Sequence, residues 1–167
     1  IEPVGNNDYK PSVARWNMAT GEINPMPYEY PDLKKVRFIY AASAEHQLYV
    51  QCYTQYDLMT ICDFNGNLKC NIYGPKWVNE KTQTQHYSLG VEFCGDKILA
   101  LYSGGDHRTD AYYPTKFLVF DLNGNYLKTL ETGYMITDFC YDKENNRLII
   151  NLNDEIQFAY LDLEGII

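Results

Sequence analysis

One seven-residue pattern occurs three times in this chain: TICDFNG (60–66), LVFDLNG (118–124) and AYLDLEG (159–165). A looser copy, ARWNMATG (14–21), carries one extra residue before its glycine. In each copy a run rich in apolar residues precedes a polar turn, which is the pattern of a β-hairpin. The Asn-Gly pairs support this, because a two-residue type I′ turn needs positive φ at both central positions. The chain is therefore expected to consist of a repeated β-unit.

A second set of strand-like runs completes the unit. LYVQCY (48–53), ILALYS (98–103) and LIINLN (148–153) begin 50 residues apart (98 − 48 and 148 − 98). Another short apolar run precedes each of them, at 36–42, 87–93 and 135–141. The unit thus has four strands, and repeated four-stranded antiparallel units are typical of β-propeller blades. A β-sandwich is the alternative, but it does not predict that the whole four-strand unit recurs.

We predict a single all-β domain, a partial β-propeller with about three and a half blades. Residues 1–35 hold the end of one blade and a connection, 36–73 and 87–130 hold one full blade each, and 135–167 hold an incomplete blade. Propellers typically close with about four to eight blades. We therefore expect either a piece of a longer protein or half of a ring that a second copy completes. The first residue, an isoleucine rather than a methionine, favours the piece.

Composition excludes several classes of function. The net charge of −8 argues against nucleic-acid binding, which needs a basic face. No apolar run is long enough to cross a bilayer. The five cysteines lack C-x-x-C spacing, so we expect buried free thiols rather than a metal site or a disulfide framework. No cofactor is predicted.

The candidate ligand-binding residues lie in three long connections, 27–35, 74–86 and 103–115. In a propeller these connections share one face, whereas the short turns lie on the other. Long loops on a rigid scaffold commonly carry function, and exposed Tyr and Trp rings suit sugars, peptides and proteins. The candidates are Tyr28, Tyr30, Trp77, His86, Asp106, His107, Arg108, Tyr112 and Tyr113.

Catalytic chemistry is the less favoured interpretation. Asp106, His107 and Asp110 could surround a divalent ion, but their spacing is weak support and a solvated loop is the favoured interpretation. Neither Ser88 nor Ser103 has an elbow motif around it, and no nucleophile and base can be paired from the sequence. We assign no catalytic residue and expect a non-enzymatic protein.

One cassette resembles a known group of proteins. It consists of FCYD (139–142), an Asn-rich turn, LII (148–150) and a closing L-D-x-x-G hairpin (161–165). It is similar to the six-bladed TolB-like or NHL-like propellers of bacterial extracytoplasmic proteins, and the resemblance covers 36–165. The resemblance implies a periplasmic or cell-surface location, often as a lipoprotein, and binding of proteins, peptides or glycans.

The sequence therefore predicts a non-catalytic binding or scaffold module that recognises a protein, peptide or glycan through aromatic-rich loops on one face. The alternative is part of a propeller hydrolase or lyase whose metal-assisted site is completed by missing blades. A homodimer that completes the ring is a further hypothesis.

Overall fold

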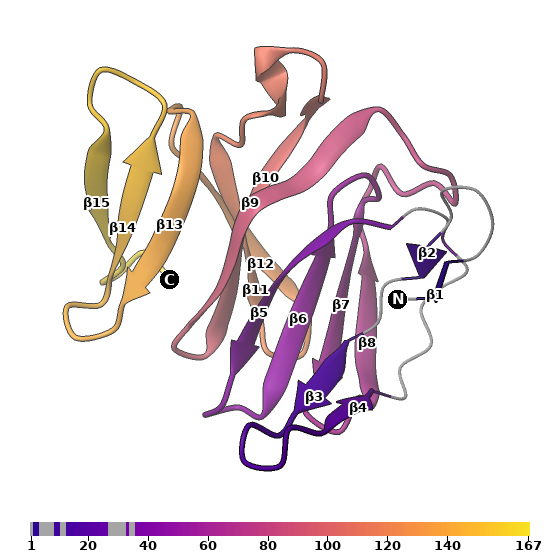
Figure 1. Cartoon of the computed structure of the whole chain (residues 1–167). Coiled ribbons are helices and arrows are strands. Elements are labelled where there is room, and N and C mark those ends of the chain that lie inside the picture. The colour runs from indigo at the N-terminus through magenta and orange to yellow at the C-terminus, as the bar shows by residue number, and fades with distance from the viewer. Residues whose placement is uncertain (1, 4–8, 11–12, 27–32, 34–35) are drawn as a thin grey trace.

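The computed structural model describes residues 2–3, 9–10, 13–26, 33 and 36–167, and the regular secondary structure of this part of the chain is almost entirely β-strand (Figure 1). Sheet I contains β5 (Phe38–Ser43), β6 (Leu48–Tyr53), β7 (Leu58–Asp63) and β8 (Leu68–Tyr73) in that order. Sheet II contains β9 (Thr84–Cys94), β10 (Lys97–Asp106), β11 (Lys116–Asp121) and β12 (Tyr126–Glu131). Sheet III contains β13 (Ile136–Asp142), β14 (Arg147–Leu152) and β15 (Phe158–Asp162).

Smaller elements accompany these sheets. Two short antiparallel pairs precede them, β1 (Glu2–Pro3) with β2 (Tyr9–Lys10) and β3 (Ala14–Trp16) with β4 (Ile23–Pro25). A 3-10 turn, η1 (Asp110–Tyr112), follows β10. No helix in the described ranges is long and apolar enough to span a membrane. The predicted all-β class and the recurring four-stranded antiparallel unit are confirmed.

The first two strands of sheet II are longer than predicted. Residues 84–86 and 103–106, expected in loops, continue β9 and β10, where Gly105 pairs with Gln85 and Asp106 with Thr84. Register shifts between Ala100 and Gly105 absorb the extra residues as β-bulges. The connection before β9 therefore ends earlier, and the connection after β10 starts later, than the apolar pattern indicates.

The predicted spacing of the second strand is off by one residue. Asp63, Asp121 and Asp162 hold the same place in the three hairpins, and they pair with Leu48, Lys97 and Arg147 respectively. Tyr49, not Leu48, therefore corresponds to Ile98 and Leu148, and the spacing is 49 and then 50 residues (98 − 49 and 148 − 98). A one-residue slip moves every side chain to the opposite face of its sheet.

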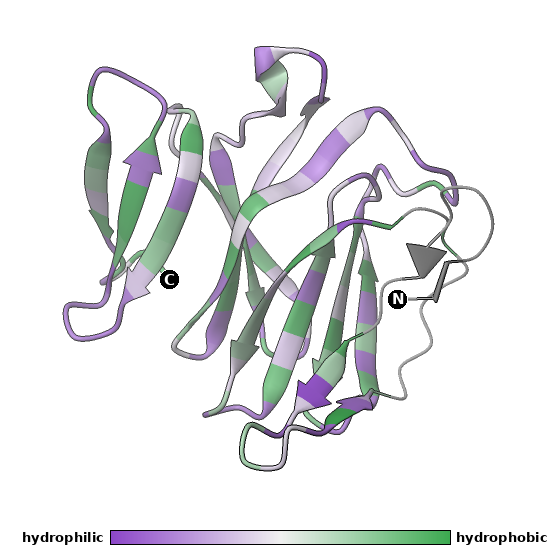
Figure 2. Ribbon diagram, in the orientation of Figure 1, coloured by the Kyte–Doolittle hydropathy of each residue, from purple (hydrophilic) through white to green (hydrophobic). Residues whose placement is uncertain are grey.

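The three sheets stack face to face around two apolar clusters. Met59 and Ile61 of sheet I pack with Ile98 and Phe120 of sheet II. The other face of sheet II packs on sheet III in a cluster of its own. Figure 2 shows hydrophobic residues along the strands of all three sheets and many hydrophilic residues in the turns. Sheet II is consequently apolar on both faces.

The first strands of the sheets lie together. β9 contacts β5 on one side and β13 on the other. The turns that follow these strands also meet, because His46 Nε2 lies 2.8 Å from the carbonyl oxygen of Gly95 and Lys143 Nζ donates to Glu45 Oε2 at 2.8 Å. The sheets thus fan outward from one line of strands, as Figure 1 shows.

The Asp-x-Asn-Gly-Asn turns are closed by their own aspartates. Asp63 Oδ1 accepts hydrogen bonds from the backbone N–H groups of Asn65 and Asn67 at 2.8 and 2.9 Å, and Asp63 Oδ2 accepts one from Asn67 Nδ2 at 2.8 Å. Asp121 makes the same three bonds at the same distances. In both turns the Asn side-chain amide, then the backbone N–H groups, hold the pKa of the carboxyl below its usual value.

The predicted type I′ geometry of these turns is wrong. In these turns only the glycines, Gly66 (φ 84°) and Gly124 (φ 86°), have positive φ. Neither of the asparagines that precede them does. Each glycine N–H donates to the aspartate carbonyl three residues earlier, and the ladder shifts register just beyond. This is a type I turn followed by a glycine bulge, which closes a hairpin as efficiently.

Gly124 fits closely against the neighbouring sheet, which leads to a prediction. A Cβ at this position would lie 2.8 Å from Cys70 Sγ and 2.9 Å from Ile72 Cδ1, whereas one at Gly133 (φ 75°) would meet nothing within 4 Å. Gly133→Ala is expected to cost about 1–2 kcal/mol of stability from the left-handed backbone alone. Gly124→Ala is expected to cost about 1–3 kcal/mol more from overpacking. Urea denaturation measures both, and equal losses would contradict the contact.

Candidate functional site

The long connections after β8 and after β10 lie at the same end of the molecule, opposite the short turns (Figure 1). Trp77 belongs to the first connection, and His107, Arg108, Tyr112 and Tyr113 belong to the second. Two further candidates, Tyr28 and Tyr30, lie outside the described residues.

The polar candidates after β10 largely bind one another. Arg108 Nε and Nη2 donate to the Asp106 carboxylate at 3.2 and 3.1 Å, and this pairing lowers the pKa of Asp106. His107 Nδ1 lies 3.0 Å from the carbonyl oxygen of Gln83, and Asp110 lies in the first turn of η1, capped by Thr109. In the described part of the chain, no three His, Cys, Asp or Glu side chains gather as a group that could hold a metal ion.

The aromatic candidates are partly packed. Tyr112 and Tyr113 stack with ring centroids 4.2 Å apart. The Trp77 ring lies edge-on to Tyr73 at 4.8 Å and covers a small buried cluster that includes Tyr56. Trp77 therefore helps to hold this connection against sheet I.

His86 does not lie in a loop. It is a buried residue of β9, only 1% exposed, and it faces Asp57, which is also 1% exposed and which the sequence did not single out. The nearest carboxylate oxygen lies 3.8 Å from His86 Nδ1, and the Tyr102 hydroxyl lies 3.3 Å from the same nitrogen. Burial lowers the pKa of His86, Asp57 raises it again, and Lys76 lowers it further. The net shift is downward, so the imidazole is neutral at neutral pH.

Asp57 anchors the start of the loop that follows β8. Its carboxylate accepts the backbone N–H of Lys76 at 2.9 Å, and its backbone carbonyl accepts the N–H of Gly74 at 2.8 Å. Burial, and then the negative charge of Asp57, raises the pKa of Tyr102. We call Asp57, His86 and Tyr102 the buried polar cluster. It positions the loop at the base of the groove described next.

A groove of about 490 Å³ separates the outer strands of sheets I and II, beside the long connections. Tyr73 and Tyr126 lie at its mouth, 52% and 56% exposed, while Tyr87 and Tyr102 are almost fully buried within it. The rest of its lining comes from Asp57, Ile72, Gly74, Pro75, Lys76, Ser103, Lys116, Leu118, Phe120 and Thr129.

Two lysines make the groove more basic than the chain as a whole. Lys76 Nζ lies 3.4 Å from the carbonyl oxygen of Gly104. Lys116 Nζ lies 5.9 Å from the Tyr102 ring centroid and 3.6 Å from Glu131. In a chain of net charge −8, such a site suits a ligand with an apolar face and a negative charge. The sequence could not indicate the groove, because its lining comes from five strands of two sheets.

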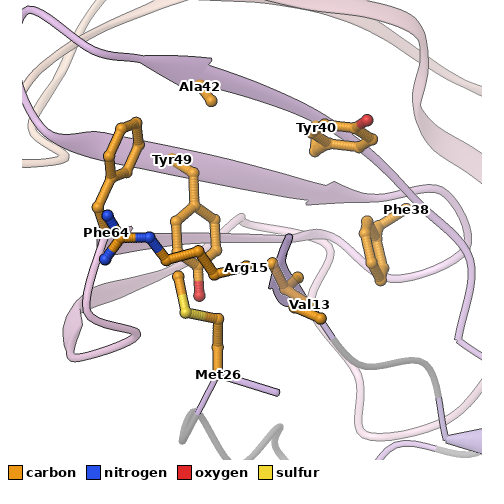
Figure 3. A pocket seen from close by; sticks show the side chains of 9 residues that line it. Val13, Arg15, Met26, Phe38, Tyr40, Ala42, Tyr49 and Phe64 are labelled. Carbon is orange, nitrogen blue, oxygen red and sulfur yellow. The ribbon is translucent and has the colours of Figure 1, made fainter. Parts of the chain in front are cut away.

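A second hollow of about 610 Å³ lies on the outer face of sheet I, beside the β3–β4 hairpin (Figure 3). Phe38, Tyr40 and Ala42 of β5 line one side, and Arg15 and Met26 line the other. Tyr40 is 71% exposed. This hollow is therefore an apolar surface with one arginine at its edge.

Comparisons with known proteins support the fold only. No protein-family profile matches the chain, and no curated protein matches it. Among solved structures, the chain is similar to Kuenenia stuttgartiensis hydrazine synthase, with a TM-score of 0.62 and 12% sequence identity. The likeness covers 92% of this chain and 40% of that chain, so this chain spans less than half the length of that structure.

Proposed function

We propose that this chain is part of a β-propeller and acts as a non-catalytic binding module, with the ligand in the groove between sheets I and II. Three facts support a propeller. Four-stranded antiparallel units repeat along the chain, the units stack face to face, and their first strands lie together. The resemblance to TolB-like and NHL-like propellers points the same way and suggests a periplasmic or cell-surface location.

The lining of the groove carries the proposal for the ligand. Exposed tyrosine faces bind the apolar faces of sugar rings and peptide side chains, and the ammonium groups of Lys76 and Lys116 attract carboxylates, sulfates or phosphates. The proposed ligand is therefore an acidic glycan or acidic peptide segment.

We assign the buried polar cluster to support rather than catalysis. The lowered pKa of His86 and the raised pKa of Tyr102 leave both groups neutral. One carboxylate oxygen of Asp57, Oδ2, accepts the backbone N–H of Lys76. The cluster thus fixes the conformation of the loop after β8 and, through the backbone of Lys76, the position of the Lys76 side chain.

Substitutions at the mouth of the groove test the proposal. Tyr126→Ala and Lys76→Ala are each expected to weaken binding of an acidic oligosaccharide or peptide about tenfold, near 1.4 kcal/mol. Both side chains are exposed, so the melting temperature is expected to change little. The measurement is titration calorimetry with ligands first selected on an array of acidic and neutral glycans and peptides.

Matched controls come from the same chain. Tyr134→Ala and Lys69→Ala remove an exposed tyrosine and an exposed lysine outside the groove and should leave affinity unchanged. Affinity should also fall with added salt, because exposed charges are screened. The proposal fails if the groove variants bind as the controls do, or if the array retains no acidic ligand.

A further inference from the structure

The groove between sheets I and II has two ends of different chemistry. β11 forms one wall, and alternate residues of a strand face the same side. Lys116 lies at one end of this wall, Leu118 in the middle and Phe120 at the other end, and all three line the groove. Four residues of a strand separate Lys116 from Phe120, which is about 13 Å. The groove is thus long enough to give a ligand two separate contacts.

The charged end lies beside the long connections. Lys116 pairs across the sheet with Tyr102, and its ammonium lies 5.9 Å from the Tyr102 ring centroid. Lys76 reaches the same place from the other wall, because its ammonium lies 3.4 Å from the carbonyl oxygen of Gly104, just beyond Tyr102 in β10. Two ammonium groups from opposite walls therefore converge around one tyrosine ring.

Two carboxylates at this end belong to the protein itself. Asp57 is 1% exposed, and its Oδ2 accepts the backbone N–H of Lys76 at 2.9 Å. Glu131 lies opposite Lys116 in the β11–β12 ladder, and its Oε1 lies 3.6 Å from the Lys116 ammonium. The Glu131 side chain is 68% exposed, so this ion pair is weak. A ligand carboxylate can therefore replace Glu131 at Lys116.

The opposite end of the groove is apolar and closed. Ile72 of β8 and Phe120 of β11 line it from the two walls. Just beyond them the two sheets touch. Cys70 Sγ donates to the carbonyl oxygen of Asn123 at 3.5 Å, and a Cβ on Gly124 would lie 2.9 Å from Ile72 Cδ1. A ligand that runs along the groove from the charged end therefore ends against Ile72 and Phe120.

Two polar side chains of the apolar half are already paired. The Tyr126 hydroxyl and Thr129 Oγ1, which both line it, share a hydrogen bond of 2.8 Å. A sugar ring carries hydroxyls around its edge, and burying them here would remove hydrogen bonds to water without replacing them. An aliphatic or aromatic side chain has no such hydroxyls and gains apolar contact area. The apolar half thus favours a peptide over a glycan.

We propose that the groove binds an extended peptide segment that places a leucine or phenylalanine against Ile72 and Phe120. An aspartate or glutamate of the same segment lies between Lys76 and Lys116. The inference rests on the proposed function, because it names the ligand of the same groove. Side chains of an extended peptide alternate, so four residues span about 13 Å on one side, and two residues suffice when long side chains complete the distance. The apolar and acidic residues of the ligand are therefore two or four residues apart, not adjacent.

Synthetic peptides of matched composition test this spacing. Each short probe carries one Phe and one Glu in an uncharged polar host sequence, spaced from one to five residues apart, and fluorescence polarisation measures its affinity. The tightest binding is expected at a spacing of two or four. Replacing the Phe of the probe by Ala, or its Glu by Gln, should weaken binding about tenfold. Equal affinity at every spacing, or no loss with either replacement, would overturn the proposal.

Protein variants assign the charged contact. Lys116→Met keeps the apolar stem and is expected to weaken binding of the Glu probe about tenfold, while the Gln probe binds as before. Lys69→Met, on an exposed lysine outside the groove, should change neither affinity. Glu131→Gln removes the competing carboxylate and should tighten binding of the Glu probe about threefold. Equal effects on the Glu and Gln probes would place the ligand carboxylate elsewhere and overturn the proposal.

The apolar contact has its own variant. Leu118→Ala is expected to weaken binding of the Phe probe about tenfold and to leave the Ala probe unchanged. Circular dichroism verifies that this variant folds, because Leu118 also packs against the cluster between sheets I and II. If it does not fold, the replacement of Phe by Ala in the probe tests the same contact in the wild-type chain.

The inference and the proposed function fail in different ways. Acidic oligosaccharides that lose affinity with Lys76→Ala and Tyr126→Ala, while every probe that carries Phe and Glu fails to bind, would overturn the inference and leave the groove as the ligand site. If neither peptides nor oligosaccharides respond to these variants, the proposed function fails, and the inference fails with it.

Discussion

Phe117→Ala is expected to lower the free energy of unfolding by about 3–5 kcal/mol, whereas Phe158→Ala changes it by less than about 0.5 kcal/mol. The two phenylalanines hold the same place in β11 and β15, but Phe117 is 0% exposed and Phe158 is 69% exposed. The Phe117 ring also lies edge-on to Phe139 at 4.9 Å, and truncation would leave a cavity between sheets II and III.

Urea denaturation measures both losses. A large loss for Phe158→Ala would show that its ring is packed within the chain although 69% of it is exposed. The comparison thus measures what burial against the next sheet contributes at this place in the repeat.

Gly74→Ala is expected to cost about 2–4 kcal/mol, the sum of overpacking and a weakened hydrogen bond to a carboxylate. The added Cβ would lie 2.2 Å from Asp57 Cγ and 2.3 Å from both carboxylate oxygens. Asp57 has no room to retreat, since His86 and Tyr102 lie behind it. The variant should also lose ligand affinity in the groove, because the backbone of Lys76 is held by that carboxylate.

A double-mutant cycle verifies the cause. In an Asp57→Ala background the carboxylate is gone, so adding Gly74→Ala should cost much less than it does in the wild type. Additive losses would show that Gly74 is needed for a reason other than its contact with Asp57.

The sequence predicted some strands to the residue and misjudged others for physical reasons. The bounds of β6 match the predicted 48–53, because this strand lies between clear turn signals. The correspondence of β6 with β10 was one residue off, because every residue of β6 is buried and no alternation of polar and apolar residues distinguishes its two faces. The hairpin type was also misjudged, since Asn-Gly suits a glycine bulge as well as a type I′ turn.

The candidate site was predicted less well than the fold. The order of strands and the lengths of the connections placed the aromatic loops on one face, but they could not show that Arg108 binds its neighbour Asp106. His86 was expected in a loop, whereas the bulged pairing of β9 and β10 buries it beside Asp57. The groove residues Tyr73 and Tyr126 were not singled out because they lie in strands, where a tyrosine is ordinary.

The sequence by itself determined the repeated four-stranded unit, the positions of its hairpin turns and the lack of long helices in the part of the chain that the structure describes, because alternation, turn residues and strand length are local properties. Only the tertiary structure decided the register of the strands, the burial of Asp57 and His86, the groove between sheets I and II and the exposure of Phe158 on sheet III. These features arise from contacts between residues far apart in the chain. The sequence of one four-stranded unit does not indicate which neighbouring sheet packs against each of its faces.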